Sequence, residues 1–300
     1  MIDEIRALLP RHLPGYEVRS IIRLGEGLDN AAYEVNGELI VRASRETDPA
    51  LRSQSTQRNA NLLAVVAGLS TLPVPEPVFV AAEAGVLAYT RLPGLPLMEH
   101  PVAEPARLAS TLGGFLSRLH QAPLEKVEKL VEQDTYPLLA WLEDAQRDYQ
   151  EIVEHLPAAA RPLVEDFLGR TPPAEPLAAP ALFCHNDLGA EHVLVDAGAS
   201  AVTGVIDWSD AAIADPARDL ALIYRDLGPK IFDLMLAQYE GRFDDAERER
   251  AVFYARCKVL EDIAYGVRTG ARPYAVAGLA HLARTFVGRD GAGARKIRTP

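Results

Sequence analysis

The sequence predicts an α+β fold of two lobes, with a small antiparallel sheet in the N-terminal lobe and mainly helices in a larger C-terminal lobe. Three observations lead to this prediction. The 300 residues of the chain are about twice the length of a common single-core domain. Strand-like runs dominate residues 1–90, whereas helical patterns dominate residues 91–300. Apolar residues make up 48% of the chain, which is enough to fill a core in each lobe.

The N-terminal lobe begins with a short helix that should cover residues 2–9 and end at Pro10. Asn36–Gly37 is the strongest hairpin signal, because both residues tolerate the left-handed backbone that tight hairpin turns need. A helix is expected at about 50–69. The expected strands are Val18–Leu24, Ala31–Val35, Glu38–Ala43, Val78–Val80 and Val86–Tyr89.

The C-terminal lobe shows one β-rich island, residues 181–210, among helical patterns. The helices are expected at about 105–120, 137–153, 160–168, 216–225, 229–240, 245–269 and 273–287.

The charge balance limits the classes of partner. The chain has 31 basic and 42 acidic residues, a net charge of −11, which argues against binding nucleic acid and suits a cationic small molecule. Its first residues lack the pattern of a signal peptide, and the longest uncharged stretch, about 59–75, is interrupted by prolines. We therefore expect a cytoplasmic protein that does not enter membranes; the oligomeric state stays open.

A glycine-rich turn between the first two predicted strands contains Gly25 and Gly27. Glycines allow backbone N–H groups to approach and hold a phosphate. An ordinary β-turn is the alternative, because two glycines alone are a weak signal.

Arg42 is the candidate cation for that phosphate. The chain has five lysines and none precedes Lys126, so an anion bound by the first third must be held by arginine or by backbone amides. A two-residue turn at 36–37 places Arg42 beside the far end of the glycine-rich turn, on the face that carries Ile40 and Tyr33. The alternative is a solvated charge at a strand end.

A second hairpin is predicted within 181–210, where two apolar runs flank a turn of small residues. If Val195 pairs with Gly204, the same ladder brings His192 opposite Asp207.

This pairing would put an imidazole and a carboxylate at the open end of the hairpin, with Asp187 in the loop just before it. Such a pair can hold a divalent metal ion, and the second carboxylate can act as a base. The alternative is a His–Asp pair with a structural role only.

The order of these motifs resembles the aminoglycoside phosphotransferase family, which includes macrolide phosphotransferases, is related to choline kinases and has a protein-kinase-like fold. The resemblance runs from about Leu24 to Tyr224. It rests mainly on the pattern His-x-Asp-x-x-x-x-His at His185–His192, and on Ile206–Leu220, which includes Asp-Pro-x-x-Asp-Leu.

The resemblance implies transfer of the γ-phosphoryl group of ATP or GTP to a hydroxyl of a small molecule. Asp187 would orient or deprotonate that hydroxyl. His192, where the family usually has Asn, and Asp207 would be ligands of Mg²⁺, and Arg42 would contact the nucleotide phosphates.

The resemblance also divides the chain into a nucleotide-binding lobe, 1–90, and a catalytic and acceptor-binding lobe, 91–300. Asp219 would be a buried carboxylate that braces the catalytic loop, and His185 would have a structural role beside it. The nucleotide base would meet a shelf and a hinge made of Ile40, Tyr89, Arg91 and Leu92.

The acceptor is less well defined by the sequence. Carboxylates at Glu261 and Asp262, with Tyr265 nearby, would suit a cationic acceptor, although a solvated helix face is the favoured alternative for these three. Asp210 is a further candidate. An antibiotic, either an aminoglycoside or a macrolide, is the favoured acceptor. A macrolide would need a larger apolar pocket. The residues that could line one are Tyr254, Tyr265, Tyr274 and Phe286. The alternatives are a housekeeping metabolite kinase, acting on an amino alcohol or a sugar, and a non-catalytic nucleotide-binding regulator.

Overall fold

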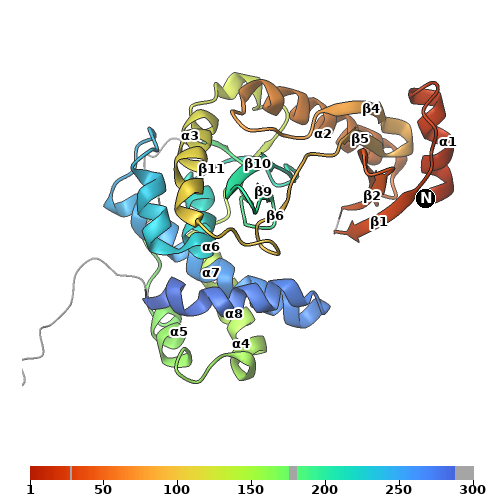
Figure 1. Cartoon of the computed structure of the whole chain (residues 1–300). Coiled ribbons are helices and arrows are strands. Elements are labelled where there is room, and N and C mark those ends of the chain that lie inside the picture. Colours follow the sequence, from red (N-terminus) through yellow and green to blue (C-terminus); the bar gives the residue numbers. More distant parts are fainter. Residues whose placement is uncertain (28, 176–180, 288–300) are drawn as a thin grey trace, which may run out of the picture.

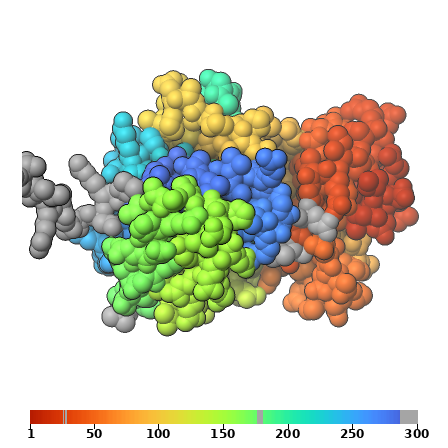
Figure 2. All heavy atoms as spheres, turned by 90° about the horizontal axis from the view of Figure 1, so that it is seen from below, coloured from red at the N-terminus to blue at the C-terminus, as the bar shows by residue number. Residues whose placement is uncertain are grey.

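The computed structural model describes residues 1–27, 29–175 and 181–287. A lobe built on an antiparallel sheet lies to one side, and a larger lobe of helices with two small sheets lies to the other (Figure 1). Seen from below, the N-terminal lobe stands beside the mass formed by α4, α5 and α8 (Figure 2). Within the described residues, no helix has the length and apolarity to cross a membrane.

The sheet of the N-terminal lobe has five antiparallel strands in the order β1-β2-β3-β5-β4. Their bounds are β1 (Ile21–Glu26), β2 (Asn30–Val35), β3 (Leu39–Ser44), β4 (Pro77–Ala81) and β5 (Val86–Thr90). Helix α1 (Ile2–His12) buries Ile5 and Leu9 in a core with Val35 and Val41 on one face of the sheet. It continues through Pro10, where the sequence predicted its end, and Leu13 N–H closes its last turn on the carbonyl of Leu9.

Helix α2 (Pro49–Leu69) lies between this sheet and the C-terminal lobe (Figure 1). Its start is strongly specified, because the side chain of Asp48 accepts hydrogen bonds from the N–H groups of Ala50, at 2.8 Å, and Leu51, at 3.0 Å. Leu62, Leu63 and Val66 of α2 are buried in the core that continues into the C-terminal lobe.

The hairpin between β2 and β3 differs from the prediction by one residue. Val35 pairs with Leu39 instead of Glu38, so Arg42 pairs with Ala32 and Ile40 with Glu34. Because successive side chains alternate between faces, the shift moves Tyr33 to the face covered by α1, opposite the one that carries Arg42 and Ile40. The predicted grouping of Tyr33 with Arg42 is therefore wrong.

The connector after β5 joins the lobes tightly. The backbone N–H of Arg91 donates to the carbonyl of Glu38, just before β3, and a few residues later β6 (Leu95–Pro96) pairs with strand β9 (Val193–Asp196) of the other lobe. Between them, Gly94 has a φ of 95° and a close contact with Thr203, which leaves no space for a side chain.

Two three-stranded sheets sit in the C-terminal lobe, in the orders β10-β9-β6 and β7-β11-β8. The strands are β7 (Glu132–Gln133), β8 (Leu182–Cys184), β9 (Val193–Asp196), β10 (Ala201–Val205) and β11 (Ala212–Ala214). Strands β6, β7 and β11 were not predicted, because two or three residues are too few to show a hydrophobic period.

The helices of this lobe are α3 (Leu108–His120), α4 (Leu138–Ile152), α5 (Arg161–Leu168), α6 (Ala217–Leu236), α7 (Asp245–Thr269) and α8 (Arg272–Val287). Short 3₁₀ turns are η1 (Ala82–Ala84), η2 (Pro105–Arg107), η3 (Leu124–Lys126) and η4 (Val153–His155). The two helices predicted at 216–225 and 229–240 form the single element α6, which is kinked at Gly228, with φ 79°, before Pro229.

Candidate active site

The hairpin of β9 and β10 carries the candidate metal ligands, with a register different from the predicted one. Val195 pairs with Val202 instead of Gly204, and a bulge follows Val202. His192 therefore lies opposite Ile206, whose N–H donates to the carbonyl of His192 at 2.9 Å. Asp207 then adopts a left-handed backbone, with φ 60°, at the end of the hairpin.

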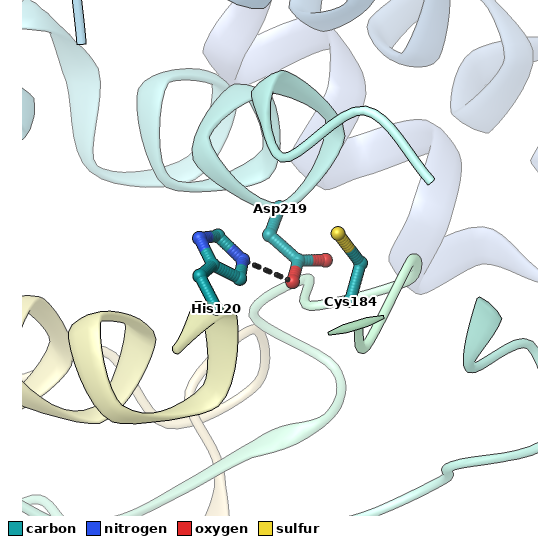
Figure 3. A group of neighbouring side chains, drawn as sticks. All are labelled: His120, Cys184 and Asp219. Atoms are coloured by element: carbon teal, nitrogen blue, oxygen red, sulfur yellow. Dashed lines mark hydrogen bonds and ion pairs between the residues drawn. The ribbon is translucent and has the colours of Figure 1, made fainter. Parts of the chain in front are cut away.

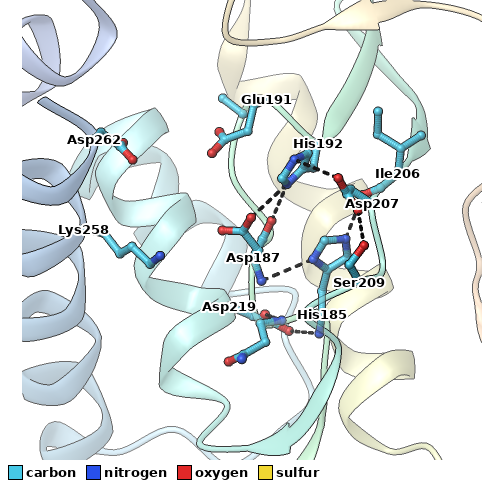
Figure 4. A network of polar contacts seen from close by, with 12 residues as sticks. His185, Asp187, Glu191, His192, Ile206, Asp207, Ser209, Asp219, Lys258 and Asp262 are labelled. Atoms are coloured by element: carbon cyan, nitrogen blue, oxygen red, sulfur yellow. Dashed lines mark hydrogen bonds and ion pairs between the residues drawn. The ribbon is translucent and has the colours of Figure 1, made fainter. Parts of the chain in front are cut away.

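His192 nevertheless lies next to both candidate carboxylates (Figure 4). Its Nε2 is 3.8 Å from Oδ2 of Asp207, and its Nδ1 is 3.4 Å from Oδ2 of Asp187. Nδ1 is also 2.8 Å from the backbone carbonyl of Asp187. A carbonyl oxygen only accepts hydrogen bonds, so Nδ1 carries the proton and Nε2 of the neutral ring presents a lone pair on the side of Asp207.

The charges in this group perturb one another. Burial acts to lower the pKa of His192, but the carboxylates of Asp187, Glu191 and Asp207 outweigh it and raise that pKa. Burial acts to raise the pKa of Asp207, but Arg42 and His192 lower it to about 2. An ionised Asp207 and a lone pair on His192 fit a divalent cation, with the phosphates of a nucleotide as further ligands. The residues that the sequence pointed to thus have the chemistry of a metal site.

Asp219, at the start of α6, is fully buried under the loop that leads from His185 to Asp187. Its Oδ1 accepts a hydrogen bond from the N–H of Asn186 at 2.7 Å, and its Oδ2 accepts one from the N–H of His185 at 2.9 Å. Oδ2 also lies 3.1 Å from Nε2 of His120, at the end of α3 (Figure 3). Cys184 completes a group that could hold a metal ion. Because both oxygens of Asp219 already accept backbone N–H groups, we interpret this group as a brace for the loop.

His185 holds the other side of the loop. Its Nε2 donates to the carbonyl of Ile206 at 2.9 Å, and its Nδ1 accepts from the N–H of Asp187 at 3.3 Å. Burial lowers the pKa of His185, which keeps the ring neutral for this pair of contacts. One imidazole therefore joins the segment before Asp187 to the segment before Asp207.

Arg42 reaches this group from the N-terminal lobe. It lies 3.2 Å from Oδ1 of Asp207, and it donates to Oγ of Ser209 at 2.7 Å. A cavity of about 410 Å³ opens beside it. Its lining includes Asn30, Ser44, Thr56, Asn59, Leu87 and Ser209.

The glycine-rich turn and the predicted hinge, residues 89–92, show fewer features specific to nucleotide binding than Arg42 does. Gly25 and Gly27 are exposed at the end of β1 and do not have a positive φ, so the backbone there does not demand glycine. Tyr89 pairs with Ile40 across β3 and β5. Arg91 is held 2.8 Å from Glu34, and Leu92 packs against Gly204.

The structure separates the four acceptor candidates. Glu261 lines a cavity of about 450 Å³ between α4 and α7, whereas Asp210 lines another of about 470 Å³ beside α2. Asp262 lies 2.8 Å from the buried Arg225, so its carboxylate is already paired. Tyr265 is 41% exposed and packs edge-on against Tyr274.

The α4 side of the Glu261 cavity was not among the predicted site residues. Asp144, Asp148 and Glu151 all line it, together with Tyr136 and Trp141. The spacing of the three acids, four and then three residues, is the signal for one face of a helix and was available in the sequence. Lys258, on the α7 side of the same cavity, was not predicted either.

Comparison with known proteins shows the family and the fold of the chain. Residues 20–254 match the profile of the phosphotransferase enzyme family. Viomycin phosphotransferase of Streptomyces vinaceus is 26% identical over 285 residues, which cover 90% of this chain and 95% of that protein. The solved GDP and kanamycin complex of APH(2″)-IIia has a TM-score of 0.67 at 20% identity, covering 94% of this chain and 98% of that chain. The apoenzyme of a macrolide 2′-phosphotransferase from Brachybacterium faecium has a TM-score of 0.61 at 23% identity, covering 93% of this chain and 98% of that chain. The predicted protein-kinase-like fold is therefore confirmed.

Proposed function

Since this chain belongs to the phosphotransferase enzyme family and is a kinase that acts on hydroxyl groups, we propose that its acceptor is a small cationic antibiotic and that its donor is ATP or GTP. The observation that carries this proposal is the position of His192 between Asp187 and Asp207. His192 contacts the candidate base, Asp187, on one side and the candidate metal ligand, Asp207, on the other.

In the proposed reaction, the acceptor hydroxyl lies against the carboxylate of Asp187 and its oxygen attacks the γ-phosphorus. The bond from that phosphorus to the bridging oxygen breaks, the nucleoside diphosphate leaves with the electron pair, and Asp187 takes the proton. Asp207 and His192 would hold Mg²⁺, which would neutralise charge on the phosphates when bound. Arg42 would contact the phosphates from the N-terminal lobe, because its guanidinium forks onto oxygen pairs.

The cavity between α4 and α7 supports a cationic acceptor. Four carboxylates line it against three cations, and its aromatic side chains Tyr136 and Trp141 can pack on a cationic group. The charged residues are Asp144, Asp148, Glu151, Glu261, Arg147, Lys258 and Arg268. A wide apolar pocket for a macrolide has less support, since Tyr254 and Phe286 are buried in the core.

The test is a panel of acceptors assayed with ATP and with GTP in the presence of Mg²⁺. Viomycin, kanamycin, a macrolide, choline and a hexose would be followed by mass spectrometry for the gain of one phosphate. We expect phosphorylation of a cationic antibiotic and none in the Asp187→Asn variant. Transfer to choline or the hexose alone would favour a metabolite kinase, and nucleotide binding without any transfer would favour a regulator. Because its donor is a nucleoside triphosphate, the proposed place of action is the cytoplasm.

A further inference from the structure

Lys258 lies near the middle of α7, and its side chain points from that helix towards Asp187 (Figure 4). The side chain is 20% exposed, and its Nζ is 3.0 Å from Oε2 of Glu261 one turn further along the helix. The ammonium also lies 5.5 Å from the ring centre of Trp141 across the cavity. Lys258 therefore stands where the acceptor cavity meets the candidate base.

Several carboxylates surround this ammonium. Burial acts to lower the pKa of Lys258, but Glu261, Asp187 and Asp262 outweigh it and raise that pKa well above its usual value. Asp210 also interacts electrostatically with Lys258. The lysine thus stays protonated at every pH at which the protein would work.

The positions around Asp187 divide into two sides. His192 and Asp207 lie on one side of the Asp187 carboxylate, and Lys258 approaches from the other (Figure 4). If the nucleotide phosphates are held at Asp207, the acceptor oxygen must come from the Lys258 side to reach both Asp187 and the γ-phosphorus in line. A cation there lies close to the oxygens that carry the negative charge during transfer.

We propose that Lys258 is a catalytic residue whose ammonium donates a hydrogen bond to the phosphoryl group as it passes to the acceptor. The inference rests on the proposed function. The bond changes are those given above, and Lys258 stays protonated throughout, so it adds no proton transfer. A fixed cation at the point where charge develops stabilises the transition state more than the bound substrates.

A structural alternative is that Lys258 only neutralises Glu261. The two roles can be separated. If Lys258 only neutralises Glu261, it is dispensable once Glu261 is replaced by a neutral residue; if it binds the phosphoryl group, it is still required. The decisive variants are Lys258→Met, Lys258→Arg and the double variant Lys258→Met with Glu261→Gln. Lys230→Met is the matched control, since Lys230 is an exposed lysine on α6.

The measurement is the affinity of each variant for ADP with Mg²⁺, without and with aluminium fluoride, which mimics the phosphoryl group in transfer. Wild-type protein and Lys230→Met should bind more tightly when aluminium fluoride is added. Lys258→Met should bind ADP within about twofold of wild type and lose at least about tenfold of this gain, since one such donor is worth about 100-fold in rate. Lys258→Arg should retain part of the gain, and the double variant should stay as defective as Lys258→Met.

Two outcomes would overturn the assignment: an undiminished gain in Lys258→Met, or a gain restored in the double variant. If wild-type protein transfers phosphate and Lys258→Met behaves like it, the Lys258 assignment fails and the proposed function stands. If wild-type protein neither transfers phosphate nor gains affinity from aluminium fluoride, both fail together. Thermal unfolding of each variant confirms that the fold is intact.

Discussion

The guanidinium of Arg42 lies 3.2 Å from the carboxylate of Asp207, a contact between residues 165 positions apart that joins the two lobes. The contact forms although the observed hairpin differs from the predicted one by one residue, because Arg42 still lies on the face of the sheet that is not covered by α1. It brings the candidate phosphate cation and the candidate metal ligand to one place.

Replacing Arg42 should therefore affect the nucleotide more than the acceptor. Arg42→Ala should raise the KM for the nucleotide by at least about tenfold, because the loss of one charged hydrogen bond costs about 1.5–3 kcal/mol. Arg42→Lys should recover only part, since an ammonium does not fork onto two oxygens. Steady-state kinetics with the nucleotide varied would measure this, and an unchanged nucleotide KM in Arg42→Ala would show that Arg42 is a lobe contact only.

Asp187→Asn should separate binding from transfer. The amide cannot take the acceptor proton, so kcat should fall by about 10²–10⁴. Nucleotide affinity should stay close to that of wild-type protein, because Asp207, His192 and Arg42 are untouched. Calorimetry of nucleotide binding alongside turnover would test the split. Wild-type turnover in Asp187→Asn would contradict the assignment.

His192 should make the Mg²⁺ requirement depend on pH. The pKa of His192 is raised above its usual value of 6.5, so the stabilisation from its protonated ring is present below pH 6.5 and is lost as pH rises through the raised pKa. Metal binding has the opposite sign, because only the neutral ring offers Nε2, so Mg²⁺ affinity should rise over the same interval.

Two variants test this role of His192. His192→Ala should need at least about tenfold more Mg²⁺ for half-maximal rate. His192→Asn should keep substantial activity, because its amide oxygen is a hard ligand, and should lack the pH-dependent component. Mg²⁺ titrations of the rate at several pH values would show this. An unchanged Mg²⁺ requirement in His192→Ala would leave His192 as a hairpin residue.

Asp219→Ala should destabilise the whole protein. It would leave the buried N–H groups of His185 and Asn186 without their acceptor and remove the partner of His120. We expect the free energy of unfolding to fall by about 3–5 kcal/mol, as when one partner of a buried polar pair is removed. Glu99→Ala, at an exposed position after β6, is the control. Denaturant unfolding of both would measure the difference, and equal stability would refute the brace.

The elements that the sequence predicts well are the long ones, since α7 has the bounds expected from its period and its start is specified by a capping box between Asp244 and Glu247. Register is harder to predict. The left-handed backbone at Asn36 and Gly37 was expected, but the turn also includes Glu38. This extra residue shifts the pairing of β2 and β3 by one position, so Tyr33 lies on the opposite face of the sheet from Arg42.

The candidate site has parts that the sequence predicts and parts that it does not. His192 and Asp207 come together although their predicted pairing was wrong, because the bulge after Val202 brings Ile206 opposite His192 and Asp207 is the next residue. The surroundings of Arg225 were not predictable, since besides its sequence neighbour Asp226 it contacts Glu191 and Asp262, which come from two other segments. Contacts of that kind depend on how helices pack, which no local pattern records.

The short connector between the lobes limits how they can move. Arg91 is bonded to Glu38 on one side, Leu95 is paired with Val195 on the other, and the carbonyl of Pro93 accepts a hydrogen bond from Thr203 at 2.8 Å. The torsions of residues 91–94 must therefore absorb any relative displacement of the lobes. We expect so short a connector to permit a small rotation of one lobe against the other and to resist sliding. We expect that a rotation of this kind, if it accompanies nucleotide exchange, would move Arg42 away from Asp207 and then restore the 3.2 Å contact.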